Sequence, residues 1–279
     1  MKLVTYSTGS GAPKVGYIED GGIQPLGDGS LLEYIVHGRS PDRRPGGETV
    51  ALEEASLHPP IARPEKIVAI GLNYEDHAAE TGAEIPDKPV VFTKYPNTII
   101  GPGAPIRIPP ITEQVDYEAE LAVVIGRRAR RVEEDDALGY VLGYTCLNDV
   151  SARDLQFGDG QWARCKSLDT FCPMGPVLVT RDEIPDPQDL DIECRLDDRQ
   201  VQQANTAQMY FGVAAIVSYC SQAFSLEPGD VIATGTPGGV GIFRKPPLLL
   251  TDGDLVSVEI ERIGRLVNRC RHEHAKVAV

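Results

Sequence analysis

Short apolar runs separated by glycine and proline recur along the chain, and their periodicity predicts mostly strands. Strands are expected over 2–7, 15–19, 23–26, 66–71, 89–94, 116–126, 140–146, 176–180, 191–196, 231–234 and 255–263. Helical spacing predicts helices over 30–37, 73–80, 135–138 and 204–224, the last being the longest. Strands outnumber helices and their connections vary in length. The pattern therefore predicts a mixed α+β, β-rich fold with a sheet-packed core rather than a doubly wound α/β fold.

A proline-dense stretch at 58–64 suggests a domain boundary, because such segments are extended and suit linkers. We expect a small β-rich N-terminal domain over 1–60 and a larger domain over 61–279. Composition predicts a mobile loop at 40–47 within the first of these.

Composition narrows the functional classes. The chain has 279 residues, a formal net charge of −14 and a sequence pI of about 4.8, so nucleic acid is not an expected partner. No apolar run approaches the roughly 20 residues of a membrane span, and the N-terminus lacks the apolar stretch of a secretory signal. Six scattered cysteines without a C-x-x-C pair predict reduced core thiols. Together these features predict a cytoplasmic protein.

The acidic strand 116–126, DYEAELAVVIG, is the first candidate for chemistry. On a strand Glu118 and Glu120 project from the same face, roughly 7 Å apart, and bare burial would cost several kcal/mol per ion. A hard divalent cation such as Mg²⁺ or Mn²⁺, with Ca²⁺ as a further candidate, would remove that cost. The alternative is a solvated strand end with exposed acids.

Three further residues could complete this site. Asp149 follows a predicted strand and could supply a third carboxylate, or it could cap a helix. Lys166 and Arg153 could offset the excess negative charge, although Lys166 alone would also suit an ordinary surface position.

His77 and Glu80 lie three residues apart, a spacing that places them on one helix face. The carboxylate could then orient the imidazole as a general base, or the two could form a plain surface pair. Gly235, Thr236 and the glycines after them follow a strand without the lysine of a phosphate loop. Such a turn could present the Thr236 hydroxyl to a small carboxylate, or be a simple tight loop.

These motifs gain specificity from their order. The series is NYEDHAAE at 73–80, DYEAEL at 116–121, NDVSARDLQ at 148–156, KSLDT at 166–170 and GDVIATGTP at 229–237. It resembles the fumarylacetoacetate hydrolase family, with the likeness covering about residues 60–270. The resemblance implies a mixed β-sandwich roll and a homodimer.

The resemblance also implies roles for individual residues. Glu118, Glu120 and Asp149 would ligate Mg²⁺ or Mn²⁺. The stretch that holds a further upstream aspartate ligand in larger members reads Gly71-Leu72-Asn73 here, so three protein carboxylates are expected. His77 and Glu80 would activate water on a segment that closes over bound ligand, and Lys166 would be the active-site lysine. The substrate site would be lined by Arg153, Gln156 and Thr236. Four further residues would either shape that pocket or belong to the core: Tyr74, Phe157, Trp162 and Met174.

These parts predict a metal-dependent C–C bond hydrolase of acylpyruvate-like diketo acids, acting through an enolate that the metal and Lys166 stabilise. Two alternatives use the same chemistry: oxaloacetate decarboxylation, and isomerisation of 2-hydroxyhepta-2,4-diene-1,7-dioate. A catalytically inactive member that only binds a metal or ligand is the non-enzyme alternative.

Overall fold

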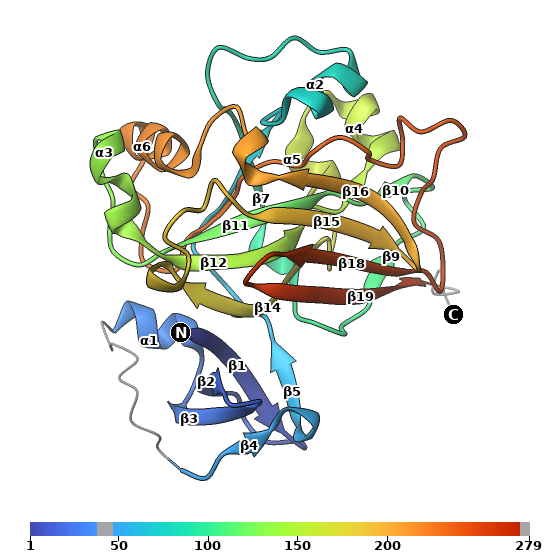
Figure 1. The fold of residues 1–279 in the computed structure, drawn as a ribbon. Helices are drawn as coiled ribbons and strands as arrows, with labels where there is room; N and C mark the ends of the chain where they lie inside the picture. The colour runs from blue at the N-terminus through green and yellow to red at the C-terminus, as the bar shows by residue number, and fades with distance from the viewer. Residues whose placement is uncertain (38–46, 274–279) are drawn as a thin grey trace, which may run out of the picture.

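The computed structural model describes residues 1–37 and 47–273, and the strand-rich mixed fold predicted from sequence is confirmed (Figure 1). Of the loop expected over 40–47, only Gly47 lies among the described residues, and His274 lies outside them. All six cysteines are buried without a disulfide partner, as expected. No helix within the described residues is long and apolar enough to cross a membrane.

A 12-stranded sheet runs through the molecule. Its order is β4 (Val50–Ala51), β3 (Gly22–Asp28), β2 (Lys14–Glu19), β1 (Lys2–Thr8), β14 (Cys172–Thr180), β12 (Val141–Asn148), β11 (Ala119–Ile125), β17 (Val231–Ala233), β6 (Ile67–Gly71) and β7 (Val90–Lys94), with β5 (Ala55–His58) on β1 and β8 (Ile99–Ile100) on β14. The N-terminal strands join the rest through β1, where Lys2 pairs with Val179. The division of the chain at residue 60 stays a prediction.

A five-stranded sheet packs against the large one (Figure 1). It consists of β16 (Arg199–Asn205), β15 (Asp191–Leu196), β18 (Leu255–Ile260), β19 (Gly264–His272) and β9 (Ile106–Ile108), and a separate pair joins β10 (Val115–Asp116) to β13 (Ser151–Ala152). Contacts of β11 with β15, β12 with β18 and β14 with β19 bring the two sheets face to face.

Strand β11 lies at the centre of this arrangement and is buried along its whole length. Leu121 and Val123 pack into the core shared with the five-stranded sheet, whereas Ala122 and Val124 pack with Leu3 and its neighbours on the other face. Burial on both faces explains why this strand is a continuous apolar run rather than an alternating one. The rigid strand therefore fixes the position of whatever lies at its N-terminal end.

Helices are short and lie around the sheets. They are α1 (Leu31–Val36), α2 (Glu75–Thr81), α3 (Glu134–Ala137), α4 (Arg153–Asp159), α5 (Trp162–Cys165) and α6 (Val213–Ala223), with 3-10 turns η1 (Leu52–Glu54), η2 (Pro96–Thr98), η3 (Leu138–Tyr140), η4 (Arg181–Glu183) and η5 (Thr206–Gln208). Helix α1 has the expected start, because Ser30 and Glu33 form a reciprocal capping box. Helices α2, α4 and α5 gather at one end of the sheets (Figure 1).

Three sequence-based expectations about elements were wrong. The helix expected from residue 204 begins at Val213, because Ala204 and Asn205 complete β16 and η5 follows. The final strand expected over 255–263 ends at Ile260, and the unpredicted β19 folds back on it. Asn73, whose position three residues before Asp76 resembles a helix cap in the sequence, does not cap α2; the N-cap is Tyr74, which makes no side-chain capping hydrogen bond.

Candidate metal centre and active site

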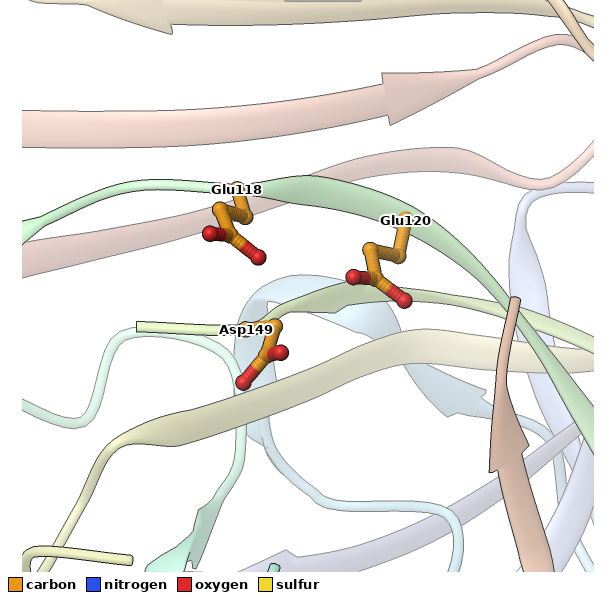
Figure 2. Close-up of side chains that lie close together, drawn as sticks. All are labelled: Glu118, Glu120 and Asp149. Carbon is orange, nitrogen blue, oxygen red and sulfur yellow. The ribbon is translucent and has the colours of Figure 1, made fainter. Parts of the chain in front are cut away.

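The three carboxylates predicted as metal ligands meet at the N-terminal end of β11. Glu118 lies just before that strand, Glu120 within it, and Asp149 just after β12. The antiparallel register places Ala119 opposite Asn148, and the Asp149 amide donates to the Glu118 carbonyl at 2.8 Å. One ligand oxygen from each carboxylate lies within 4.8 Å of the others, and all three side chains are buried (Figure 2). Glu118 thus occupies the break between β10 and β11 rather than a continuous strand, yet it still faces Glu120.

Three buried cations surround this carboxylate trio. The Lys166 ammonium lies 2.7 Å from Glu118 Oε2 and 2.8 Å from Asp149 Oδ2. Lys94 contacts the other oxygen of Asp149 at 2.6 Å, and Arg153 contacts Glu118 Oε1 at 2.8 Å. Because these side chains are at most 3% exposed, solvent screens their attraction weakly.

The three cations do not stabilise the ionised forms of the acids equally. Burial would raise the pKa of Glu118, but the attraction of Lys166 and Arg153 outweighs it and lowers that pKa to about 2. Burial and the repulsion of Asp149 and Glu118 raise the pKa of Glu120 well above its usual range. Burial would likewise lower the pKa of Lys166, yet Asp149 and Glu118 reverse this and raise it. Glu120 is therefore the acid whose negative charge the neighbouring cations compensate least.

This charge distribution fits a divalent cation. Four buried carboxylates face three buried cations: Asp116, Glu118, Glu120 and Asp149 against Lys94, Arg153 and Lys166. Among the described residues Glu120 has no ion pair, and its carboxylate accepts only the Gly235 amide at 2.8 Å. Oxygen-only donors suit hard ions such as Mg²⁺ or Mn²⁺ without distinguishing between them.

The predicted His77–Glu80 pair is present on α2. His77 Nδ1 lies 2.8 Å from Glu80 Oε1, and the His77 side chain is 9% exposed. The second Glu80 oxygen accepts the Gly239 amide at 2.9 Å. Glu80 is thereby fixed from two sides, and the hydrogen bond at Nδ1 leaves Nε2 as the ring nitrogen available to a ligand.

The glycine-rich segment 235–242 holds the site together through its backbone. The Gly235 amide donates to the Glu120 carboxylate and the Gly239 amide to the Glu80 carboxylate. The Gly241 amide donates to the Asp116 carboxylate at 2.8 Å. Gly235 and Gly239 have φ of 101° and 102°, which L side chains rarely adopt. The loop is therefore more than a tight turn, because it orients carboxylates from three separate segments.

A cavity of about 400 Å³ opens beside these groups. Its wall contains seven of the nine predicted site residues, namely His77, Glu118, Glu120, Arg153, Gln156, Lys166 and Thr236. Asp149 lies behind that wall through its bond to Lys166, as does Glu80 through His77. Of the pocket-shaping candidates, Phe157 and Trp162 line the cavity, whereas Tyr74 and Met174 are core residues.

Comparison with known proteins identifies the family. Residues 66–271 match the family profile described as fumarylacetoacetate (FAA) hydrolase C-terminal. This chain belongs to the fumarylacetoacetate hydrolase family. The mitochondrial oxaloacetate tautomerase fahd2 of Xenopus laevis is 42% identical over 285 residues, which cover 96% of this chain and 89% of that protein.

Solved structures of similar proteins share the fold. The fumarylacetoacetate hydrolase of the psychrophile Exiguobacterium antarcticum superposes with a TM-score of 0.89 at 40% identity, over 98% of this chain and 100% of that one. The 2-hydroxyhepta-2,4-diene-1,7-dioate isomerase of Mycobacterium marinum gives 0.81 at 37% identity, over 99% and 100%. The family and the fold were therefore correctly inferred from the ordered motifs.

Sequence reasoning missed Lys94, Asp116 and the part played by Asn73. Lys94 ends an apolar strand, a position where a charged side chain is informative only once its partner Asp149 is known. Asp116 binds Arg153 Nε at 2.9 Å. The Asn73 amide group bonds the Thr234 carbonyl at 2.7 Å and both backbone groups of Phe211, so it is structural and adds no fourth acid to the trio.

Proposed function

We propose that this family member is a divalent-cation-dependent enzyme that moves a proton at the carbon beside the 2-oxo group of a small 2-oxo acid. The observation that carries the proposal is the His77 imidazole, held by Glu80 and lining the same cavity as Glu118 and Glu120. A base fixed beside a cation site suits abstraction of a proton next to a polarised carbonyl.

The chain's own residues would divide the work. Glu118, Glu120 and Asp149 would hold the cation, which when bound polarises the 2-oxo carbonyl and makes the adjacent C–H more acidic. His77 Nε2 would take that proton and return it elsewhere on the substrate, while Glu80 stabilises the imidazolium. The Lys166 ammonium would stabilise negative charge developing on the 2-oxo oxygen, because its raised pKa keeps it protonated.

Proton transfer is favoured over hydrolysis by the names of the relatives. The Xenopus laevis protein is a tautomerase and the Mycobacterium marinum protein an isomerase, and both names describe rearrangement without water consumption. Oxaloacetate is therefore the first substrate to test. Decarboxylation of oxaloacetate is the related alternative, because it also builds negative charge on the 2-oxo oxygen.

Hydrolysis of an acylpyruvate is the second candidate, supported by the Exiguobacterium antarcticum fumarylacetoacetate hydrolase. In that reaction His77 would deprotonate a water that attacks the distal carbonyl. The homodimer implied by the family resemblance remains a prediction that light scattering of the purified protein would test.

The test follows three substrates with Mg²⁺ by NMR and ultraviolet absorbance: oxaloacetate, 2-hydroxyhepta-2,4-diene-1,7-dioate and an acylpyruvate. We expect fast conversion of enol-oxaloacetate to its keto form, with little pyruvate from oxaloacetate or acylpyruvate. His77→Ala should slow this conversion by about 10²–10⁴-fold while leaving Mg²⁺ binding intact. The matched control is His272→Ala, which removes an exposed histidine. Metal binding without turnover of any substrate would instead identify a non-catalytic member.

A further inference from the structure

The cavity has two chemically different halves. The charged lining residues Glu118, Glu120, Arg153 and Lys166 are at most 5% exposed and define an inner half, whereas the apolar lining residues Leu72, Phe92, Phe157 and Trp162 are half-buried or exposed and belong to an outer half. The Phe92 and Trp162 rings meet edge to face, with centroids 5.2 Å apart and an interplanar angle of 81°. This geometry is a favourable aromatic contact and presents a preformed apolar surface.

Positive charge is confined to the inner half. Lys166 and Arg153 are the only lysine or arginine among the described residues that line the cavity, and both already bind carboxylates. Arg153 is further occupied by Asp116 through Nε and by Gln156 through Nη1. A second carboxylate reaching the outer half would therefore lose water without gaining a cation.

Two details mark the outer half as a binding surface. A Cβ on Gly71 would lie 2.4 Å from the Trp162 ring, so glycine makes room for the indole against β6. Phe157 is 62% exposed although it is aromatic. Lys166 Nζ lies 5.4 Å from the centre of the Phe92 ring, so the charged and apolar halves adjoin directly.

We infer that, among 2-oxo acids longer than oxaloacetate, the outer half selects those whose remote substituent is flat, apolar and uncharged, with Phe92, Phe157 and Trp162 as specificity residues. The inference rests on the proposed function, since it assumes that the carboxylate and 2-oxo group face the charged wall. An aromatic ring on the substrate would then displace water from the apolar wall.

Binding of matched oxamates tests this selectivity without turnover. N-phenyloxamate has a carboxylate beside a carbonyl, as in a 2-oxo acid, followed by a ring, and N-(4-carboxyphenyl)oxamate adds one remote charge. Calorimetry with Mg²⁺ should show the uncharged ligand binding at least about tenfold tighter than the charged one. It should also bind about tenfold tighter than oxamate itself, which has the same carboxylate and amide carbonyl but no ring. Equal affinities, or preference for the charged ligand, would overturn the inference.

Phe157→Arg should reverse part of this preference by bringing a cation to the outer wall, narrowing the gap between the two oxamates about tenfold. Phe157→Gln is the neutral control at the same position, and Val36→Arg adds the same charge at a 58% exposed site on α1. An unchanged ratio of the two oxamate affinities in Phe157→Arg would contradict the role of Phe157 as a specificity residue. Failure of the proton-transfer assay with this binding order intact would reject the proposed function alone.

Discussion

Two Glu-x-Glu pairs in this chain have the same spacing and opposite surroundings. Glu118 and Glu120 are buried and converge with Asp149. Glu259 and Glu261, at the end of β18, are exposed beside a surface groove that Asp191 and Glu193 also line. Among the described residues, only the first pair belongs to a group of three metal-ligand atoms within 4.8 Å.

The difference arises from what other segments bring to each pair. The first pair is met by Asp149, Lys166 and Arg153, and the sheet packing withdraws all of them from water. At the second pair, neighbouring Glu193 accepts a hydrogen bond from Gln200 at 2.6 Å and lies 3.8 Å from Arg195. Exposed charges of this kind are hydrated and screened, so they need no ion. Acid spacing alone therefore does not define a metal site.

The largest effect should come from removing the unpaired charge of the buried pair. Glu120→Gln keeps the side-chain shape but removes the charge of a proposed metal ligand, so we expect activity to fall a thousandfold or more, about 4 kcal/mol of barrier. Steady-state kinetics over a range of Mg²⁺ concentrations measures this. Activity restored fully by excess Mg²⁺ would mean weakened binding only, and unchanged activity would remove Glu120 from the site.

Breaking the cation side of the buried cluster should destabilise the fold. Arg153→Met leaves Asp116 and Glu118 without a partner they contact at 2.9 and 2.8 Å, which should cost about 3–5 kcal/mol of unfolding free energy. Urea denaturation measures the change. The control is Arg164→Met, which breaks the exposed pair with Asp159 and should not change stability measurably. Equal losses in the two variants would contradict the distinction between buried and exposed charge.

Metal removal sharpens the same contrast. Mg²⁺ at about 100 times its dissociation constant should stabilise the native protein by about 2.7 kcal/mol, seen as a higher Tm than in chelator. Glu120→Gln should lose most of this response. It should also raise the Tm of the metal-free protein, because Glu120 is repelled by Asp149 and Glu118. A lower metal-free Tm in the variant would show that the Gly235 hydrogen bond outweighs that repulsion.

Local patterns predicted the strands better than their connections. The strand predicted over 191–196 matches β15, whereas the apolar stretch from Ala204 was assigned to a helix because its strand partner in β15 is not visible locally. The acidic trio was predictable because each member ends or begins an apolar run. Lys94 and Asp116 were not, since their roles depend on contacts with Asp149 and Arg153 that arise only from the sheet order. The spacing of Asn73 from Asp76 suits a helix N-cap, but the Asn73 side-chain amide instead donates to the buried carbonyl of Thr234.

The smallest effect is expected at the exposed pair. Within residues 1–37 and 47–273, Glu261 Oε2 accepts only a long 3.4 Å hydrogen bond from the Asp191 amide, so Glu261→Gln should shift unfolding free energy by no more than about 0.5 kcal/mol. Activity and the Mg²⁺ response of Tm should stay at native values. The variant removes the same charge from the same type of residue as Glu120→Gln, so it separates position from net charge. A reduced Mg²⁺ response in Glu261→Gln would place part of the metal binding on the surface groove, and the contrast between the two pairs would fail.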